Sequence, residues 1–166
     1  ARTQSSVEFL VPLGLKSLLE NWGAKNVTEL DWWQPVERNG VTIQPTPVQH
    51  WSKRTFFDRN KTLWSGWMIQ WSDFAFYFAG DAGYSSDFKE TAQKLGKPDL
   101  AAIPVGAYEP RDFMKSAHIN PEEAVKVFSD LGAKYAIGIH WGTFKLTLEP
   151  MNEPPKRLKK ALKAAG

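Results

Sequence analysis

Strand-like and helix-like segments alternate along the second half of the chain, and this alternation constrains the fold more than any other feature. Residues 74–78 are continuously aromatic or apolar, which predicts a strand buried on both faces. Residues 85–95 carry apolar side chains at helical spacing, and residues 100–105 are strand-like again. A helix over 120–131, with an Asn-Pro start, precedes a further strand over 135–139. This order predicts an α/β layered fold.

The first half of the chain is richer in predicted strands and contains one predicted helix. A basic, amphipathic helix is expected at the end of the chain, and Ser72-Asp73 suits a tight hairpin turn. No repeat or linker interrupts the sequence, so one compact unit over 1–166 is expected. In addition to the elements of the second half, the sequence predicts strands over 7–11, 27–30, 41–48 and 62–70 and a helix over 15–22. The expected terminal helix covers 154–165.

Composition excludes several classes of protein. The formal net charge is only +3 and its basic residues are mostly unclustered, which argues against a nucleic-acid partner. No cysteine is present, so disulfides and thiolate metal sites are excluded while the compartment stays open. No apolar run approaches the ~20 residues of a spanning helix, so we expect a cytoplasmic or membrane-peripheral protein. The polar start, residues 1–6, suggests a processed chain or one begun inside a longer protein.

Three polar side chains follow predicted strands at their ends. His50 comes after the strand over 41–48, Asp81 after the apolar strand within a Gly-Asp-Ala-Gly turn, and His140 after the last strand. Ligands of α/β folds bind beyond the carboxyl ends of strands, and His nitrogen with Asp oxygen is a ligand set for Zn²⁺. Each residue alone also fits a structural role, because Asp and Gly are common in turns. His118 could simply precede the helix cap at Asn120.

Six motifs in a fixed order resemble the N-acyl-phosphatidylethanolamine phospholipase D (NAPE-PLD) family of the metallo-β-lactamase superfamily. The resemblance covers nearly the whole chain. The motifs are LDWW at 30–33, TPVQHWSKR at 46–54, FAGDAGY at 78–84, DLAAIPVGAYEPR at 99–111, HINPEEA at 118–124 and IHWGTF at 139–144.

The resemblance implies a four-layer αβ/βα sandwich with two zinc ions at the edges of its sheets. Within it, His50 resembles a ligand of the first metal, Asp81 the carboxylate that bridges both metals, and His140 a ligand of the second. His118 resembles a catalytic histidine beside the scissile phosphate, and Asp81 shares the catalytic role. Two metal ions suit in-line displacement at phosphorus. Arg54, shortly after His50, and Tyr108, within the motif at 99–111, are expected to contact a phosphodiester or phospholipid substrate. Simple exposure to solvent explains Arg54 equally well.

The chain departs from the family because the His-x-His-x-Asp-His motif, which supplies the remaining ligands, is absent. We therefore expect residues 1–166 to form the C-terminal half of the hydrolase domain. The chain alone is expected to be inactive, to bind zinc weakly or at one site, and to need the missing N-terminal half or a second copy. The alternative is a non-catalytic module that pairs through an exposed sheet face.

The basic segment 156–163 near the end of the chain allows a second kind of contact. Its lysines could touch anionic lipid, which would make the protein membrane-peripheral. A solvated helix face, with favourable charges near a helix C-terminus, explains the same pattern.

Overall fold

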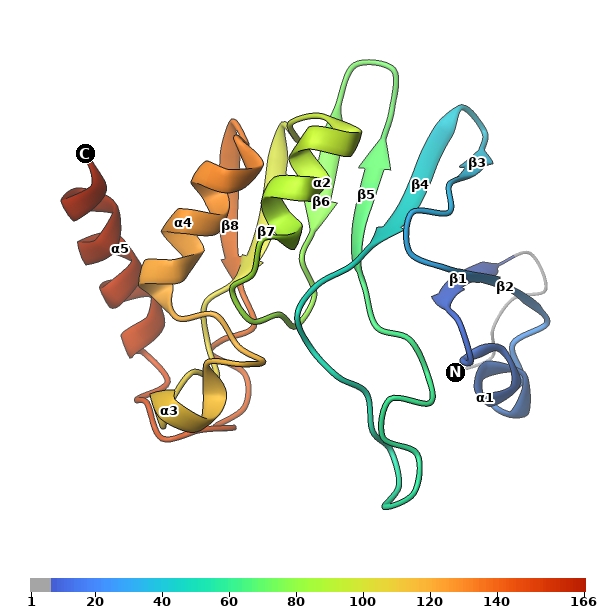
Figure 1. The fold of residues 1–166 in the computed structure, drawn as a ribbon, viewed down its shortest axis with the longest axis horizontal. Helices are drawn as coiled ribbons and strands as arrows, with labels where there is room; N and C mark the ends of the chain where they lie inside the picture. The colour runs from blue at the N-terminus through green and yellow to red at the C-terminus, as the bar shows by residue number, and fades with distance from the viewer. Residues whose placement is uncertain (1–6) are drawn as a thin grey trace.

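A computed structural model describes residues 7–166, and the polar segment 1–6 lies outside the described residues. The chain forms a six-stranded mixed sheet with helices on one face, beside a two-stranded parallel pair (Figure 1). The fold therefore has the α/β character that the alternating segments predict. In order, the elements are β1 (Glu8–Pro12), α1 (Lys16–Asn21), β2 (Asn26–Leu30), β3 (Val36–Arg38), β4 (Val41–Thr46), β5 (Gly66–Gln70), β6 (Ala75–Phe78), α2 (Asp87–Leu95), β7 (Leu100–Pro104), α3 (Arg111–Met114), α4 (Pro121–Leu131), β8 (Tyr135–Ile139) and α5 (Glu153–Ala165).

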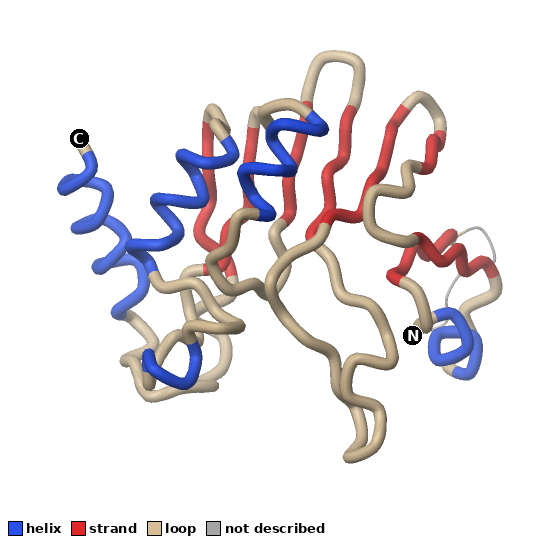
Figure 2. Tube along the Cα trace, in the orientation of Figure 1, coloured by secondary structure: helices blue, strands red, loops and turns tan. Residues whose placement is uncertain are grey.

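The strands of the large sheet follow each other in sequence order, from β3 to β8. β4, β5 and β6 pair antiparallel, and the expected hairpin between β5 and β6 closes where the Trp71 amide donates to the Phe74 carbonyl, 2.8 Å away. β6, β7 and β8 pair parallel and are connected through α2 and α4. Consequently β4, β6, β7 and β8 run in one direction, and their carboxyl ends meet at the edge that carries the long loops at the bottom of Figure 2.

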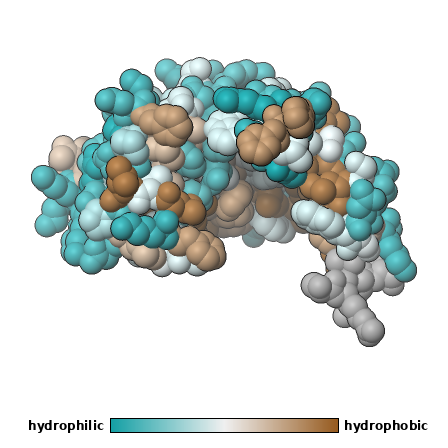
Figure 3. All heavy atoms as spheres, turned by 90° about the horizontal axis from the view of Figure 1, so that it is seen from below, coloured by the Kyte–Doolittle hydropathy of each residue, from teal (hydrophilic) through white to brown (hydrophobic). Residues whose placement is uncertain are grey.

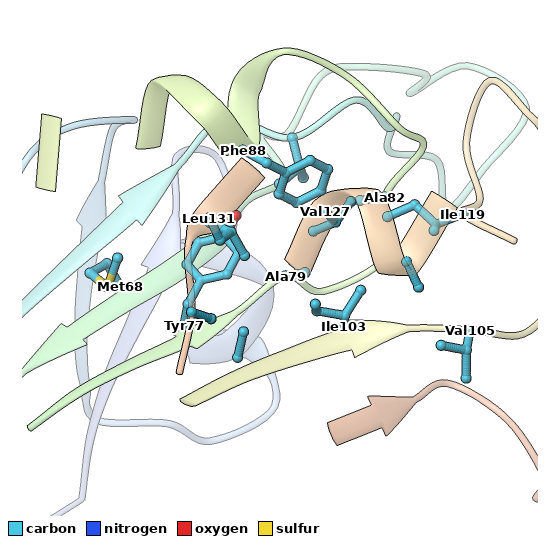
Figure 4. Packing of buried hydrophobic residues seen from close by; sticks show 14 residues of the cluster. Met68, Tyr77, Ala79, Ala82, Phe88, Ile103, Val105, Ile119, Val127 and Leu131 are labelled. Atoms are coloured by element: carbon cyan, nitrogen blue, oxygen red, sulfur yellow. The ribbon is translucent and has the colours of Figure 1, made fainter. Parts of the chain in front are cut away.

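The main core lies between the sheet and helices α2 and α4 (Figure 4). Tyr77 of β6 packs edge-to-face on Phe88 of α2, with ring centroids 6.3 Å apart. Helix α4 begins with a capping box, in which the Asn120 side chain accepts from the Glu123 amide at 2.8 Å. Its apolar face brings Val127 onto the same cluster, so the two crossover helices seal one side of the sheet.

The opposite face of the sheet is open. Side chains alternate along a strand, so the residues on either side of buried Tyr77 point away from the helices. On that face Phe78 is 40% exposed, Ile137 is 50% exposed and Tyr135 is 71% exposed. The prediction that residues 74–78 are buried on both faces is therefore wrong for the described chain, because no described element covers this side. Seen from below, the molecule is arched around a hollow (Figure 3).

Smaller differences from the sequence predictions have local causes. The strand predicted over 62–70 begins only at Gly66, because the residues before it bond to other loops. The Leu63 amide donates to the Leu13 carbonyl, and the Trp64 indole donates to the Val48 carbonyl. The short elements β3 and α3 were not predicted. None of the helices described is long and apolar enough to cross a membrane.

Candidate metal and phosphoester site

Four side chains that the sequence analysis singled out converge at the carboxyl edge of the sheet. His50 follows β4 by a few residues, Asp81 follows β6, and His140 follows β8 directly. His118 arrives from the loop between α3 and α4. The imidazole rings of His50 and His118 are 5.3 Å apart between centroids, and those of His118 and His140 are 5.6 Å apart. The common strand direction explains this convergence of residues 90 positions apart.

Gln49 connects three of these loops through hydrogen bonds. Its backbone carbonyl accepts from the Gly83 amide at 2.7 Å, and its side-chain amide donates to the Ser116 carbonyl at 2.8 Å. The turn after Asp81 passes so close to the loop between α3 and α4 that a Cβ on Gly83 would lie 2.7 Å from the Ser116 carbonyl oxygen. Glycine at this position thus has a packing reason, whereas the motif at 46–54 contains Gln49 without indicating this role.

His140 and Asp81 are in direct contact. Nε2 of His140 lies 3.0 Å from Oδ1 of Asp81. The hydrogen bond with Asp81 raises the pKa of His140 against the opposing effect of burial. The same bond lowers the pKa of the Asp81 carboxyl, again against burial. Both shifts favour an ion pair between a carboxylate and an imidazolium, and both follow from this one contact.

The pKa of His118 is shifted in the opposite direction to that of His140. Burial is the main reason that the pKa of His118 is lowered to about 4; Asp81 opposes the shift, and the neighbouring His50 and His140 rings contribute to it. Its imidazole is therefore neutral near pH 7. The guanidinium of Arg111 donates to the His118 backbone carbonyl at 2.7 Å and fixes this loop against α4, where the same guanidinium pairs with Glu123.

The donor atoms of the cluster are suited to a metal. His50 Nε2 and His118 Nδ1 are buried and have no hydrogen-bond partner, and a buried imidazole nitrogen without a partner is costly. The other nitrogen of His50, Nδ1, lies 2.7 Å from the Trp51 carbonyl, which orients the ring as a backbone carbonyl does for zinc-binding histidines. Within residues 7–166, however, no three His, Cys, Asp or Glu side chains form a group that could hold a metal ion.

The two residues expected to contact substrate lie in different environments. Arg54 lines the same open hollow as His50 and Asp81, and its guanidinium donates to the Thr62 hydroxyl at 3.0 Å. Tyr108 is fully buried, and its hydroxyl donates to Oε1 of Glu153 at 2.7 Å. The structure thus places Arg54 beside the cluster, whereas the side chain of Tyr108 has no exposed surface that could contact a substrate.

Glu149 supports the loop that follows His140 and was not found from the sequence. Its buried carboxylate accepts backbone N–H bonds from Ala107 at 2.7 Å, Tyr108 at 3.3 Å and Glu109 at 3.1 Å. These bonds join the loop after β8 to the loop after β7. A Cβ on Gly106 would collide with the carbonyl oxygen of His140, so the two loops are in close contact here as well. Gly106 itself lies within the motif at 99–111.

Comparison with known proteins identifies the class of protein. A family model described as the beta-lactamase superfamily domain matches residues 1–141. A solved structure of a possible metal-dependent hydrolase from Veillonella parvula has the same fold, with a TM-score of 0.73 at 17% identity, over 98% of this chain and 62% of that chain. The chain belongs to the metallo-β-lactamase superfamily, as the motifs predict.

Within the superfamily the chain is NAPE-PLD-like. It is 47% identical to N-acyl-phosphatidylethanolamine-hydrolyzing phospholipase D 1 of Caenorhabditis elegans, over 95% of this chain and 48% of that protein. It is 40% identical to the mitochondrial N-acyl-phosphatidylethanolamine-hydrolyzing phospholipase D of Saccharomyces cerevisiae, over 90% of this chain and 34% of that protein. The chain thus spans about half the length, or less, of these curated relatives.

Proposed function

We propose that the chain supplies one side of the active site of a zinc-dependent phosphodiesterase of the phospholipase D type. Its substrates would resemble N-acyl-phosphatidylethanolamine, the compound named in the two curated relatives. The observation that supports this most is the convergence of His50, Asp81, His118 and His140 at one sheet edge, with ring centroids of neighbouring histidines less than 6 Å apart.

His50, Asp81 and His140 are the proposed metal ligands. When bound, two zinc ions would stabilise the negative charge that develops on the phosphoryl oxygens. The unpartnered Nε2 of His50 is free to ligate, while the two oxygens of Asp81 suit a carboxylate shared between two ions. His140 already presents Nε2 toward that carboxylate.

His118 and Arg54 are the proposed substrate contacts. The neutral imidazole of His118 has an unpartnered nitrogen, Nδ1, which could hydrogen-bond a phosphoryl or leaving-group oxygen. Arg54 brings a permanent positive charge to the hollow beside His50, and a guanidinium pairs well with a phosphodiester. Asp81, whose Oδ1 lies 3.0 Å from Nε2 of His140, would keep the His140 ring beside the metals.

We further propose that residues 1–166 act as the C-terminal half of a larger hydrolase domain. The open apolar face of the sheet and the share of the relatives that the chain matches both support this arrangement. The missing half, or a second copy of the chain, would cover that face and complete the ligand set. The chain alone should then be inactive.

A fragment-complementation experiment tests this proposal. The chain is expressed alone and together with the part of the C. elegans relative that it does not match, and hydrolysis of N-acyl-phosphatidylethanolamine and zinc binding are measured. We expect activity only from the pair, and its loss in Asp81→Ala and His140→Ala but not in the distant Trp71→Ala. Two tight zinc sites and turnover in the chain alone would refute the proposal.

A second candidate is a non-catalytic module that pairs through its open sheet face. Exposed Phe78, Tyr135 and Ile137 favour it, because such surfaces mark interfaces. Mass measurement with and without denaturant separates the two candidates. A self-associating species of 18.8 kDa subunits supports the module, and a co-purifying second fragment supports the enzyme.

A further inference from the structure

The side chain of Arg111, the first residue of α3, connects the loop that carries His118 to helix α4. One terminal nitrogen of the guanidinium, Nη1, donates to the backbone carbonyl of His118 at 2.7 Å. The other, Nη2, pairs with the carboxylate of Glu123 in the first turn of α4. The side chains of this ion pair are 23% and 22% exposed, so the contact lies largely out of water. One guanidinium thus joins the backbone of His118 to a helix of the main core.

The residues that follow His118 give this connection a firm base. Ile119 is 0% exposed and belongs to the main core (Figure 4). The amide of Asn120 donates at 3.3 Å to Oε2 of Glu123, the same carboxylate oxygen that receives Arg111. The carboxylate of Glu123 is therefore fixed from two sides. Because Arg111 is held by that carboxylate, its second arm can hold the carbonyl of His118 at a defined place.

The position of the His118 ring within the cluster depends on that backbone. Its centroid is 5.3 Å from the His50 ring and 5.6 Å from the His140 ring. Its Nδ1 is buried and has no hydrogen-bond partner, so this nitrogen does not anchor the ring. A reacting group that is displaced by about 1 Å can lose about 100-fold in rate. Contacts that fix the backbone of His118 should therefore matter for any chemistry at its ring.

An arginine near a phosphodiester site could instead bind the phosphate itself. Arg54 has the surroundings for that role, because it lines the hollow beside the cluster. Arg111 does not, since Glu123 balances its charge and both of its terminal nitrogens are already bonded. To reach a phosphoryl oxygen, these nitrogens would have to leave a carboxylate and a carbonyl. The geometry favours an indirect role for Arg111.

We propose that Arg111 is a positioning residue, which together with Glu123 sets the place of the His118 imidazole among the rings of the cluster. The inference rests on the proposed function, in which His118 contacts a phosphoryl or leaving-group oxygen. The planar guanidinium reaches two acceptors in a fixed geometry, whereas an ammonium is a single point charge on a flexible stem. Arg111→Lys should therefore keep one of the two contacts and lose the other.

Nuclear magnetic resonance of the chain alone tests the positioning, because only three histidines are present. Their ring resonances are recorded after isotope labelling of histidine, and one His→Gln variant for each ring assigns them. In Arg111→Ala we expect the His118 resonances to shift or broaden more than those of the other two rings. Arg111→Lys should give an intermediate change. The matched control is Arg38→Ala, which removes an ion pair with Glu8 on β3, at the opposite edge of the sheet from β8. It should leave all three rings unchanged.

Steady-state kinetics of the complemented pair of fragments supplies the functional measurement. We expect Arg111→Ala to lower kcat about 10- to 100-fold while KM stays within about twofold. The double variant Arg111→Ala/His118→Ala should be no slower than His118→Ala alone, because Arg111 acts through that ring. Arg111→Lys should recover part of the lost kcat. Glu123→Gln should lower kcat as well, since it removes the charge that orients the guanidinium.

Several results would overturn the inference. Unchanged His118 resonances in Arg111→Ala would show that the guanidinium does not place the ring. A raised KM at unchanged kcat would make Arg111 a substrate contact, and additive losses in the double variant would make its role structural. If Arg111→Ala does not fold, Arg111→Lys and Glu123→Gln are compared in the same way. Absence of hydrolysis by the unmodified pair would count against the proposed function alone, and the ring resonances would then decide the positioning.

Discussion

The buried carboxylate of Glu149 offers the sharpest test of how the candidate site is held together. In Glu149→Ala the backbone amides of Ala107, Tyr108 and Glu109 lose their acceptor. Ala107 is 6% exposed and Tyr108 is 0% exposed, so water does not readily replace the carboxylate as the acceptor for these two amides. A buried donor without a partner costs about 1–3 kcal/mol, so two such donors cost about 4 kcal/mol. In Glu149→Gln one oxygen remains, and we expect about half that loss.

Thermal unfolding followed by circular dichroism measures the global effect. For a chain of this length each kcal/mol lowers Tm by about 2–4 °C, so Glu149→Ala should lower it by about 10 °C. Limited trypsin digestion measures the local effect, because exposed Lys145 lies in the loop that Glu149 anchors. Cleavage at Lys145 should become faster by more than the loss of global stability alone would cause. The control is Glu37→Ala, which removes an exposed carboxylate from edge strand β3. If Glu149→Ala unfolds within about 0.5 kcal/mol of that control, the three amide bonds do not hold the loops together.

Three further predictions follow from the same geometry. Gly106→Ala should destabilise the protein by about 1–3 kcal/mol in urea unfolding, because its Cβ meets the His140 carbonyl; an unchanged midpoint would contradict this close contact. Asn120→Ala should cost about 1 kcal/mol by loss of the cap on Glu123, and Asn120→Ser should restore most of it. Although burial raises it, accepted hydrogen bonds hold the pKa of Glu149 below its usual 4.5. The wild-type advantage over Glu149→Gln should therefore be complete above about pH 5 and shrink as the pH falls below 4.5; an advantage that persists in acid would contradict that sign.

Much of the local structure could be predicted from the sequence because it depends on neighbouring residues. Helix α4 begins as the Asn-Pro start indicates and ends at Gly132, which has the left-handed conformation typical of a helix C-terminus, since capping is a local interaction. The candidate residues also came from local patterns, as His50, Asp81 and His140 each follow a strand. Sequence reasoning placed Tyr108 near a substrate, but its hydroxyl is bonded to Glu153, 45 residues away. The roles of Gln49 and Glu149 were missed because their partners also lie far away along the chain, between 40 and 67 residues for their side-chain bonds.

The amino-acid sequence by itself determined the α/β class, the superfamily and the four side chains of the candidate site. These depend on strand periodicity, helix caps and motifs, which involve residues close together in the sequence. Only the tertiary structure decided that His118 lies between His50 and His140 in the cluster, and that Glu149 joins the loops around them. It also decided that one face of the sheet stays open and that Phe56 and Phe57 stand in water. Burial and proximity depend on which distant segments pack together, and no local pattern contains that information.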